Sequence, residues 1–147
     1  MGERSTLADF AFTEPLRVRW GECDMQGIVF NPNYLAFADV AMTEHLRWAG
    51  FPYPEALLPY GTDIFAVSSK VDFRSPAKFD DLLTMGARVQ RIGNTSFIYR
   101  IAIFRSEELL SEIETTYVCA TPDERKPVPV PQPFRDAVAR LERIAAA

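Results

Sequence analysis

Apolar and polar residues alternate in five stretches of the chain, and each stretch predicts a strand. In the first, Leu16, Val18 and Trp20 alternate with arginines, the period of two that is typical of a half-buried strand. The last three strands are joined by short turns at 93–94 and 106–108, and such connections favour antiparallel pairing. The apolar positions of the four later strands are Phe65, Val67, Val71 and Phe73; Leu83, Met85, Ala87 and Val89; Phe97, Tyr99, Ile101 and Ile103; and Leu109, Ile113, Tyr117 and Cys119.

A helix is predicted between the first strand and the other four. Asn31 is a suitable N-cap, because its side chain can accept a hydrogen bond from a free backbone N–H, and Pro32 suits the first helical position. Gly50 is a stop signal, so the helix is expected over 32–49. Apolar residues cover most of its circumference, and the polar remainder falls on one side at Asp39, Thr43 and Arg47. A helix of this kind is largely buried, as expected if a sheet wraps around it.

The remaining segments are a loop and a tail. The stretch 51–61 is broken by prolines and predicts a loop, and 122–133 is a proline-rich spacer that cannot join a central sheet. A short amphipathic helix follows, outlined by Phe134, Val138, Leu141 and Ile144. One helix against one antiparallel sheet is an α+β architecture. The length predicts a single domain over 1–147, with the spacer and C-terminal helix at 122–147.

Composition and charge exclude several classes of function. The net charge of −4 argues against a nucleic-acid-binding protein, which usually carries a basic surface. No apolar run approaches the roughly 20 residues of a membrane span, so we expect no membrane partner. The two cysteines make neither a disulfide framework nor a zinc site. Because the opening residues MGERSTLADF lack the apolar core of a secretory signal, we expect a cytoplasmic protein.

Candidate chemistry gathers in the stretch GECDMQGIVFNPNY at 21–34. Asp24 lies shortly before the start of the helix, where free N–H groups and a partial positive charge are available. An ordinary strand-to-helix connection and a site that holds a reacting group both fit this pattern. Pro32 has no N–H, and the Asn31 side chain is expected to occupy the N–H of one of the next two residues. The backbone N–H of Asn31 is therefore the favoured donor.

Two stretches resemble the hot-dog-fold acyl-CoA thioesterases, in the branch of the 4-hydroxybenzoyl-CoA thioesterase. They are VRWGECDMQGIVFNPNYLAF and KVDFRSPAKFDDLL. The resemblance implies a hot-dog fold, in which the antiparallel sheet wraps the central helix and two subunits join edge to edge. It also implies that acyl-CoA binds at the subunit interface of a homodimer or homotetramer. No cofactor is implied, since coenzyme A is part of the substrate.

The resemblance assigns roles to particular residues. Asp24 would be the catalytic carboxylate, as general base or as nucleophile, and the Asn31 backbone N–H would bind the thioester oxygen. Many relatives carry histidine or tyrosine at the position of Asn31, so the resemblance assigns this role to its backbone alone. Gly27 would let the substrate approach the backbone, although it would equally serve a tight turn. Substrate contacts are expected at Phe30 and Tyr34, and CoA phosphate contacts at Arg88 and Arg91.

The function implied is hydrolysis of a small acyl-CoA, aromatic ones included, to the free acid and CoA. A non-catalytic acyl-CoA or acyl-carrier binding module on the same fold is the main alternative, because fold alone does not decide function. An enoyl-CoA hydratase is disfavoured, since it typically pairs an Asp with a nearby His, and His45 lies well along the helix. Cys23 lacks a base and is expected to be buried. Asp39 and Glu44 are expected on the polar side of the helix.

Overall fold

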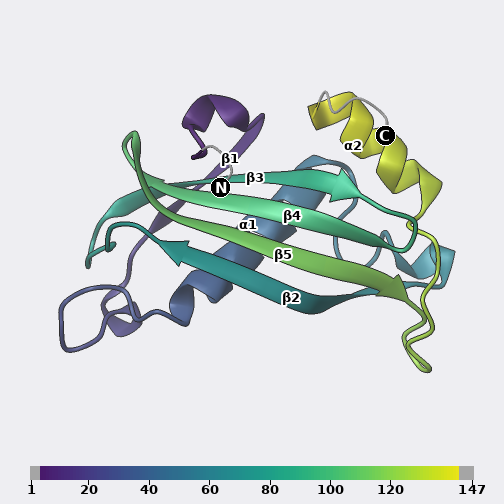
Figure 1. The fold of residues 1–147 in the computed structure, drawn as a ribbon, viewed down its shortest axis with the longest axis horizontal. Helices are drawn as coiled ribbons and strands as arrows, with labels where there is room; N and C mark the ends of the chain where they lie inside the picture. Colours follow the sequence, from purple (N-terminus) through teal and green to yellow (C-terminus); the bar gives the residue numbers. More distant parts are fainter. Residues whose placement is uncertain (1–3, 143–147) are drawn as a thin grey trace.

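The computed structural model describes residues 4–142, and its centre is one five-stranded sheet. The strand order is β1-β3-β4-β5-β2, with every neighbouring pair antiparallel. Figure 1 shows the long strands lying side by side. The bounds of the strands are Phe12–Arg17 for β1, Asp63–Phe73 for β2, Leu82–Ile92 for β3, Ser96–Arg105 for β4 and Glu108–Ala120 for β5. The predicted antiparallel sheet is confirmed.

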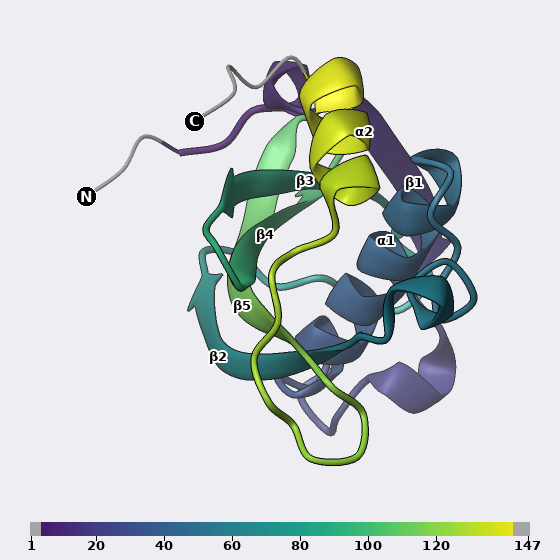
Figure 2. The same cartoon turned by 90° about the vertical axis from the view of Figure 1, so that its right-hand side faces the viewer.

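The long helix α1, Asn33–Trp48, packs on the concave face of this sheet against β1, β3 and β4. Figure 2 shows the strands curling around it. Its buried side chains meet the inward residues of β3 and β4 in one apolar core. On β3 these are the four residues that the alternation predicted: Leu83, Met85, Ala87 and Val89. The predicted α+β hot-dog arrangement is therefore confirmed.

The first strand lies earlier than its alternation predicted. β1 pairs with β3 from Phe12 opposite Ala87 to Arg17 opposite Leu82. The chain then leaves the sheet and forms a 3₁₀ turn over Trp20–Glu22, where the Trp20 side chain is 83% exposed. The prediction of an inward Trp20 was wrong, because the apolar alternation continues past the point where the partner strand begins.

The start of α1 also differs from the expectation. Pro32 occupies the N-cap position, and its side chain makes no capping hydrogen bond in the described part of the chain. The Asn33 N–H instead donates to the Phe30 carbonyl at 2.9 Å, and the Asn33 side chain donates to the Glu22 carbonyl at 2.8 Å. The predicted Asn31 cap was therefore wrong, because backbone carbonyls of the preceding turn take the N–H groups that a cap would bind.

The tail helix α2, Gln132–Glu142, covers the end of the core, with Phe134 and Val138 buried as predicted. It begins inside the predicted spacer, and Ile144 lies outside the described residues. Figure 1 shows α2 near one end of the sheet, while the segment that leads into α1 lies at the other end. Across residues 4–142, no helix has both the length and the apolar character to span a membrane.

Candidate active site

The loop between β1 and α1 is a tight hairpin fixed by backbone hydrogen bonds. The Asp24 N–H donates to the Ile28 carbonyl at 2.9 Å, and the Phe30 N–H donates to the Glu22 carbonyl at 3.0 Å. A bond from the Val29 N–H to the Ala77 carbonyl, at 2.9 Å, holds the hairpin against the segment before β3. The position of Asp24 is therefore set by the main chain and not by a side-chain partner.

The Asp24 carboxylate opens onto a hollow of about 340 Å³, whose other lining residues are Trp20, Cys23, Gly27 and Phe79. Its Oδ1 atom accepts the Gln26 N–H at 2.8 Å. No Lys or Arg pairs with it among residues 4–142, and no donor is bound to its Oδ2 atom in that part of the chain. One carboxylate oxygen is thus oriented by the turn, while the other is available to a water or a thioester.

Gly27 closes the turn that follows Asp24. Its N–H donates to the Asp24 carbonyl at 3.0 Å, and its φ of 78° lies in the left-handed region that favours glycine. A Cβ added there would meet nothing within 4 Å, so the protein itself does not crowd this position. The turn conformation accounts for the glycine, and the space beside it is open to a ligand.

The first turn of α1 leaves one backbone donor free. The Tyr34 N–H donates to the Asn31 carbonyl at 3.2 Å and the Asn33 N–H to Phe30, while Pro32 has no N–H. The Asn31 N–H has no acceptor among the described residues. A free N–H at the positive end of a helix suits a developing negative charge. Asn31 is thus the donor that the sequence favoured, although carbonyl groups and not its side chain occupy the other N–H groups.

Cys23 lines the hollow and is half-buried, packed against the core, whereas the sequence predicted a buried residue. Its Sγ lies 3.9 Å from the Arg19 carbonyl. Burial, together with the negative charges of Asp24 and Glu22, raises the pKa of its thiol. A thiol with a raised pKa is a poor nucleophile, because the thiolate is the reactive form.

The two aromatic residues predicted to contact substrate lie in different surroundings. Phe30 is exposed in the turn just before α1. Tyr34 is buried, packs against Phe73 with ring centroids 5.3 Å apart, and accepts the Ala77 N–H on its hydroxyl at 3.1 Å. Within one chain, Tyr34 therefore supports the segment around Ala77, which holds the hairpin. It does not line the hollow beside Asp24.

Two aromatic walls of the site were missed by the sequence reasoning. Trp20 and Phe79 also line a neighbouring hollow of about 560 Å³, together with Leu16, Val18 and Val40. A second hollow, lined by these apolar residues and by Arg17, Arg19 and Asp80, therefore continues from Asp24 along the side of β1. The sequence offered one signal, since Phe79 lies in the quoted stretch KVDFRSPAKFDDLL, but nothing there places it beside Asp24.

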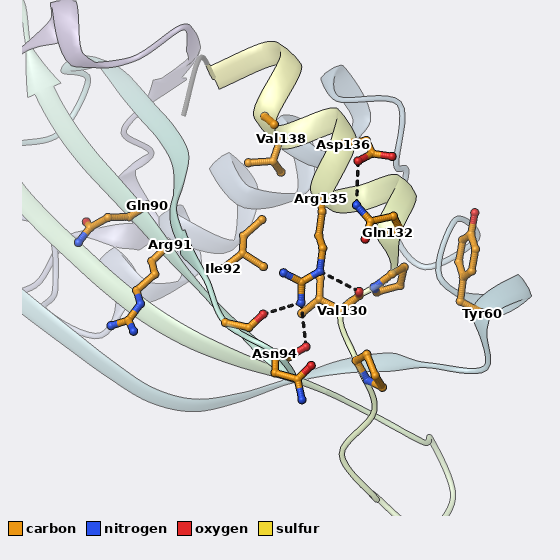
Figure 3. Close-up of a pocket in the computed structure, with 14 residues that line it drawn as sticks. Tyr60, Gln90, Arg91, Ile92, Asn94, Val130, Gln132, Arg135, Asp136 and Val138 are labelled. Carbon is orange, nitrogen blue, oxygen red and sulfur yellow. Dashed lines mark hydrogen bonds between the residues drawn. The ribbon is translucent and has the colours of Figure 1, made fainter. Parts of the chain in front are cut away.

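The arginines predicted to bind phosphate lie away from Asp24 in the same chain. The guanidinium of Arg88 stands over the Phe10 ring at 5.6 Å, on the outer face of the sheet. Arg91 lines a groove of about 990 Å³ between α2 and the turn after β3, as Figure 3 shows. Because β3 begins beside the Asp24 end and rises by ~3.3 Å per residue, its two ends are roughly 30 Å apart.

Arg135 is a second cation in this groove that the sequence did not reveal. Its guanidinium donates to the carbonyls of Gly93 at 2.5 Å, Asn94 at 2.9 Å and Val130 at 3.2 Å. These contacts tie α2 to the turn between β3 and β4 (Figure 3). No carboxylate pairs with Arg91 or Arg135 among residues 4–142. The Arg135 guanidinium is nevertheless engaged by three backbone carbonyls, so Arg91 is the more available of the two cations.

The polar residues of α1 lie outside the hollow. His45 is buried and hydrogen-bonded to Tyr99 and Glu142, so it is not available to work with Asp24 as a hydratase pair would require. Glu44 pairs with Arg47 along the helix, and Asp39 is exposed. None of the three lines the hollow around Asp24.

A model of the thioesterase superfamily matches residues 26–112, more than half of the chain. The chain belongs to this superfamily. The acyl-CoA thioester hydrolase YbgC of Escherichia coli O6:H1 is 31% identical over 122 residues, which cover 82% of this chain and 90% of that protein. The predicted family and the predicted class of enzyme, a thioester hydrolase, are confirmed. The matched segment begins two residues after Asp24, so the role of Asp24 stays a prediction.

Solved structures of relatives share the fold. The PA5185 protein of Pseudomonas aeruginosa strain PAO1 superimposes with a TM-score of 0.83 at 30% identity, over 95% of this chain and 97% of that one. An Asp-to-Asn mutant of 4-hydroxybenzoyl-CoA thioesterase, solved with 4-hydroxybenzoyl-CoA, gives a TM-score of 0.78 at 25% identity, over 86% and 97%. The thioesterase fold of this chain is thereby established.

Proposed function

We propose that this thioesterase hydrolyses a small apolar acyl-CoA, aromatic acyl groups included, to the free acid and CoA. The observation that carries the proposal is Asp24, whose carboxylate opens onto a hollow with one oxygen free. The helix start that follows the hairpin keeps the Asn31 N–H unbound within the described chain. Trp20 and Phe79 offer apolar and aromatic surface beside the carboxylate.

Asp24 takes part in thioester hydrolysis in one of two ways. As a base, it takes a proton from water while the water oxygen adds to the carbonyl carbon. As a nucleophile, its own oxygen adds there and forms an anhydride that water then hydrolyses. In both routes the C–S bond breaks, and the CoA sulfur leaves with the bonding electrons and gains a proton. The Asn31 N–H stabilises the oxyanion, and such a donor is worth about 3 kcal/mol.

The active form in this proposal is a homodimer or a dimer of dimers. β2 is an edge strand of 11 residues, and side chains from Ala66 to Lys70 are exposed along it. A long open edge of this kind favours pairing with another strand. Antiparallel pairing of β2 with its copy would bring the groove end of one subunit beside the Asp24 end of the other. Arg91, which lines that groove, would then bind phosphates of a CoA whose thioester lies in the partner subunit, whereas Arg88 lies over Phe10 outside the groove.

A thiol-release assay with aromatic, short and long acyl-CoAs tests the proposed function. We expect turnover with small apolar or aromatic acyl groups and slower turnover as chain length increases. Tight binding of acyl-CoA without thiol release would instead identify a binding module. Hydration of an enoyl-CoA without thiol release would identify a hydratase.

A further inference from the structure

One buried residue connects the start of α1 to the hairpin that carries Asp24. Ala77 is fully buried, and both of its backbone groups are hydrogen-bonded. Its carbonyl accepts the Val29 N–H at 2.9 Å, and its N–H donates to the Tyr34 hydroxyl at 3.1 Å. Val29 belongs to the hairpin, and Tyr34 belongs to the first turn of α1. The hairpin is therefore held to the helix through the main chain of Ala77.

Tyr34 supplies the side chain that holds this connection. It is only 2% exposed, and its ring packs against Phe37 and Phe73 with centroids 6.1 and 5.3 Å apart. The packed ring keeps the hydroxyl at one place. A buried backbone N–H that loses its acceptor is unfavourable, so the main chain at Ala77 would have to move if this hydroxyl were removed.

Arg105 holds the same segment from the sheet. It is the last residue of β4, and its Nη1 donates to the Pro76 carbonyl at 3.2 Å and to the Asp81 carboxylate at 2.8 Å. Burial alone would raise the pKa of Asp81, but hydrogen bonds, that from Arg105 among them, outweigh it and lower the pKa. We call residues 76–81 the brace. It is fixed by Arg105 near both of its ends and by the Tyr34 hydroxyl at Ala77.

The brace sets how the two groups of the proposed site lie relative to each other. Asp24 is carried by the hairpin, whereas the Asn31 N–H is fixed at the start of α1. The Asn31 carbonyl accepts the Tyr34 N–H at 3.2 Å, so Tyr34 holds the helix start with its backbone and the brace with its hydroxyl. A displacement of about 1 Å between reacting groups can cost about 10²-fold in rate. A small shift of the brace should therefore affect the reaction.

We propose that Tyr34 and Arg105 are positioning residues for the thioesterase reaction. Neither lines the hollow beside Asp24. Through the brace they place the Asp24 carboxylate relative to the Asn31 N–H, so their loss lowers kcat and leaves substrate binding nearly unchanged. The effect on kcat rests on the proposed function, whereas the placement of the hairpin does not.

The test compares Tyr34→Phe and Arg105→Lys with the wild type. Phe keeps the ring of Tyr34 but removes the acceptor of the Ala77 N–H. Lys keeps the charge of Arg105 but lacks its planar fork, and it is the second variant if the first folds poorly. Tyr53→Phe is the matched control, because the Tyr53 hydroxyl donates to Asp63 at 3.0 Å, at the opposite end of the sheet from the brace.

Tyr34→Phe should lower kcat for thiol release about tenfold, with KM changed less than about twofold. Arg105→Lys should lower kcat less, and Tyr53→Phe should leave it unchanged. In an Asp24→Asn background, Tyr34→Phe should cause less than about a twofold further loss, because two residues that act through one step are not additive. All rates are compared at a folded fraction matched by thermal melts.

Amide hydrogen exchange gives a measurement that needs no activity. In Tyr34→Phe the Val29 N–H should exchange about tenfold faster, because its acceptor lies on the loosened brace. The Val130 N–H donates to the Asn94 carbonyl at 2.9 Å, far from the brace, and should keep its exchange rate. Local loosening moves Val29 alone, whereas a loss of global stability moves both amides.

A lower melting temperature with unchanged kcat in Tyr34→Phe would reduce Tyr34 to a structural role and overturn the proposal. So would an equal loss of kcat in the wild-type and Asp24→Asn backgrounds, or an unchanged exchange rate at Val29. If the wild type releases no thiol, or if Asp24→Asn keeps full turnover, the proposed function fails. Faster exchange at Val29 but not at Val130 would then still show that Tyr34 places the hairpin.

Discussion

The two ends of β3 are held in opposite ways. At the Asp24 end, main-chain bonds fix the hairpin, and Asp24 and Asn31 each keep a polar group free within the described chain. At the α2 end, side chains do the holding, and the polar atoms of His45 and Glu142 are bound inside the protein. A group that reacts must be free to contact the substrate, whereas a group that holds the structure in place must be fully hydrogen-bonded within the protein.

Whether the polar atoms of a residue are free or bound within the protein indicates its role better than the residue type does. Histidine is the residue type most often used for acid–base work, yet both ring nitrogens of His45 are engaged in the core. Asp24 is an unremarkable loop aspartate by type, but its surroundings leave it open. We therefore expect changes at the Asp24 end to act on kcat and changes at the α2 end to act on KM.

The largest effect is expected for Asp24→Asn. The change keeps size and shape but removes the negative charge, so the side chain can serve neither as base nor as nucleophile. Steady-state thiol release should show kcat reduced by at least about 10²-fold, the lower end for a general base. Acyl-CoA binding should persist, and loss of the charge should favour the anionic substrate.

Asp80→Asn is a suitable control for this change, because Asp80 is an exposed carboxylate nearby that pairs with Arg17. Its kcat should stay close to that of the wild type. Near-normal turnover in Asp24→Asn, at a folded fraction matched by thermal melt, would exclude Asp24 as the reacting group.

A cluster of charged side chains around Glu112, on the outer face of the sheet, predicts how stability changes in acid. Glu112 is buried and binds Arg74 at 2.6 Å and Arg100 at 2.9 Å. Burial alone would raise the pKa of its carboxyl, but hydrogen bonds from Arg74, Ser5 and Arg100 outweigh it and lower the pKa to about 2. A lowered pKa stabilises the fold above the unfolded value near 4.5, and this stabilisation is lost as the pH falls towards 2.

Urea unfolding should therefore show the free energy of unfolding decrease by about 3 kcal/mol from this group between pH 4.5 and 2. Glu112→Gln should be less stable at pH 7 and should lack this part of the pH dependence. An unchanged slope in Glu112→Gln would show that other carboxylates control acid unfolding.

Arg91→Ala should raise KM by about tenfold with kcat nearly unchanged, because a phosphate contact contributes uniform binding.

Heterodimers test whether the two ends of the site come from different subunits. When one subunit carries Asp24→Asn and the other Arg91→Ala, the working Asp24 would use the intact groove of its partner, and KM should be normal. When both changes lie in one subunit beside a wild-type partner, KM should be raised. The reverse pattern would place the groove and Asp24 of one chain in the same site.

The sheet and central helix could be predicted because their signals are local. The alternation at Leu83, Met85, Ala87 and Val89 marks the inward face of a strand wherever its partners lie. The first strand shows the limit of this signal. Trp20 continues the alternation of Leu16 and Val18, but only pairing with β3 decides where a strand ends, and that pairing stops at Arg17.

The site was predictable in part for the same reason. Asp24 and Gly27 belong to one short motif, so the sequence places them together. The walls at Trp20 and Phe79 come from segments that only the fold brings together. The contact between His45 and Glu142 spans 97 positions, and no spacing rule connects residues so distant. The sequence could predict the reacting group but not its surroundings.

The smallest effect is expected for Cys23→Ala, although Cys23 lines the same hollow as Asp24. Burial and the neighbouring carboxylates raise the pKa of its thiol, so the thiolate needed for attack is scarce at neutral pH. Turnover should stay within a few-fold of the wild type, and a thiol-blocking reagent should inhibit the wild type only by filling the hollow. Cys23→Ala should then be insensitive to the reagent while remaining active. An inactive but folded Cys23→Ala would instead make the thiol the nucleophile and reduce Asp24 to a residue of the turn.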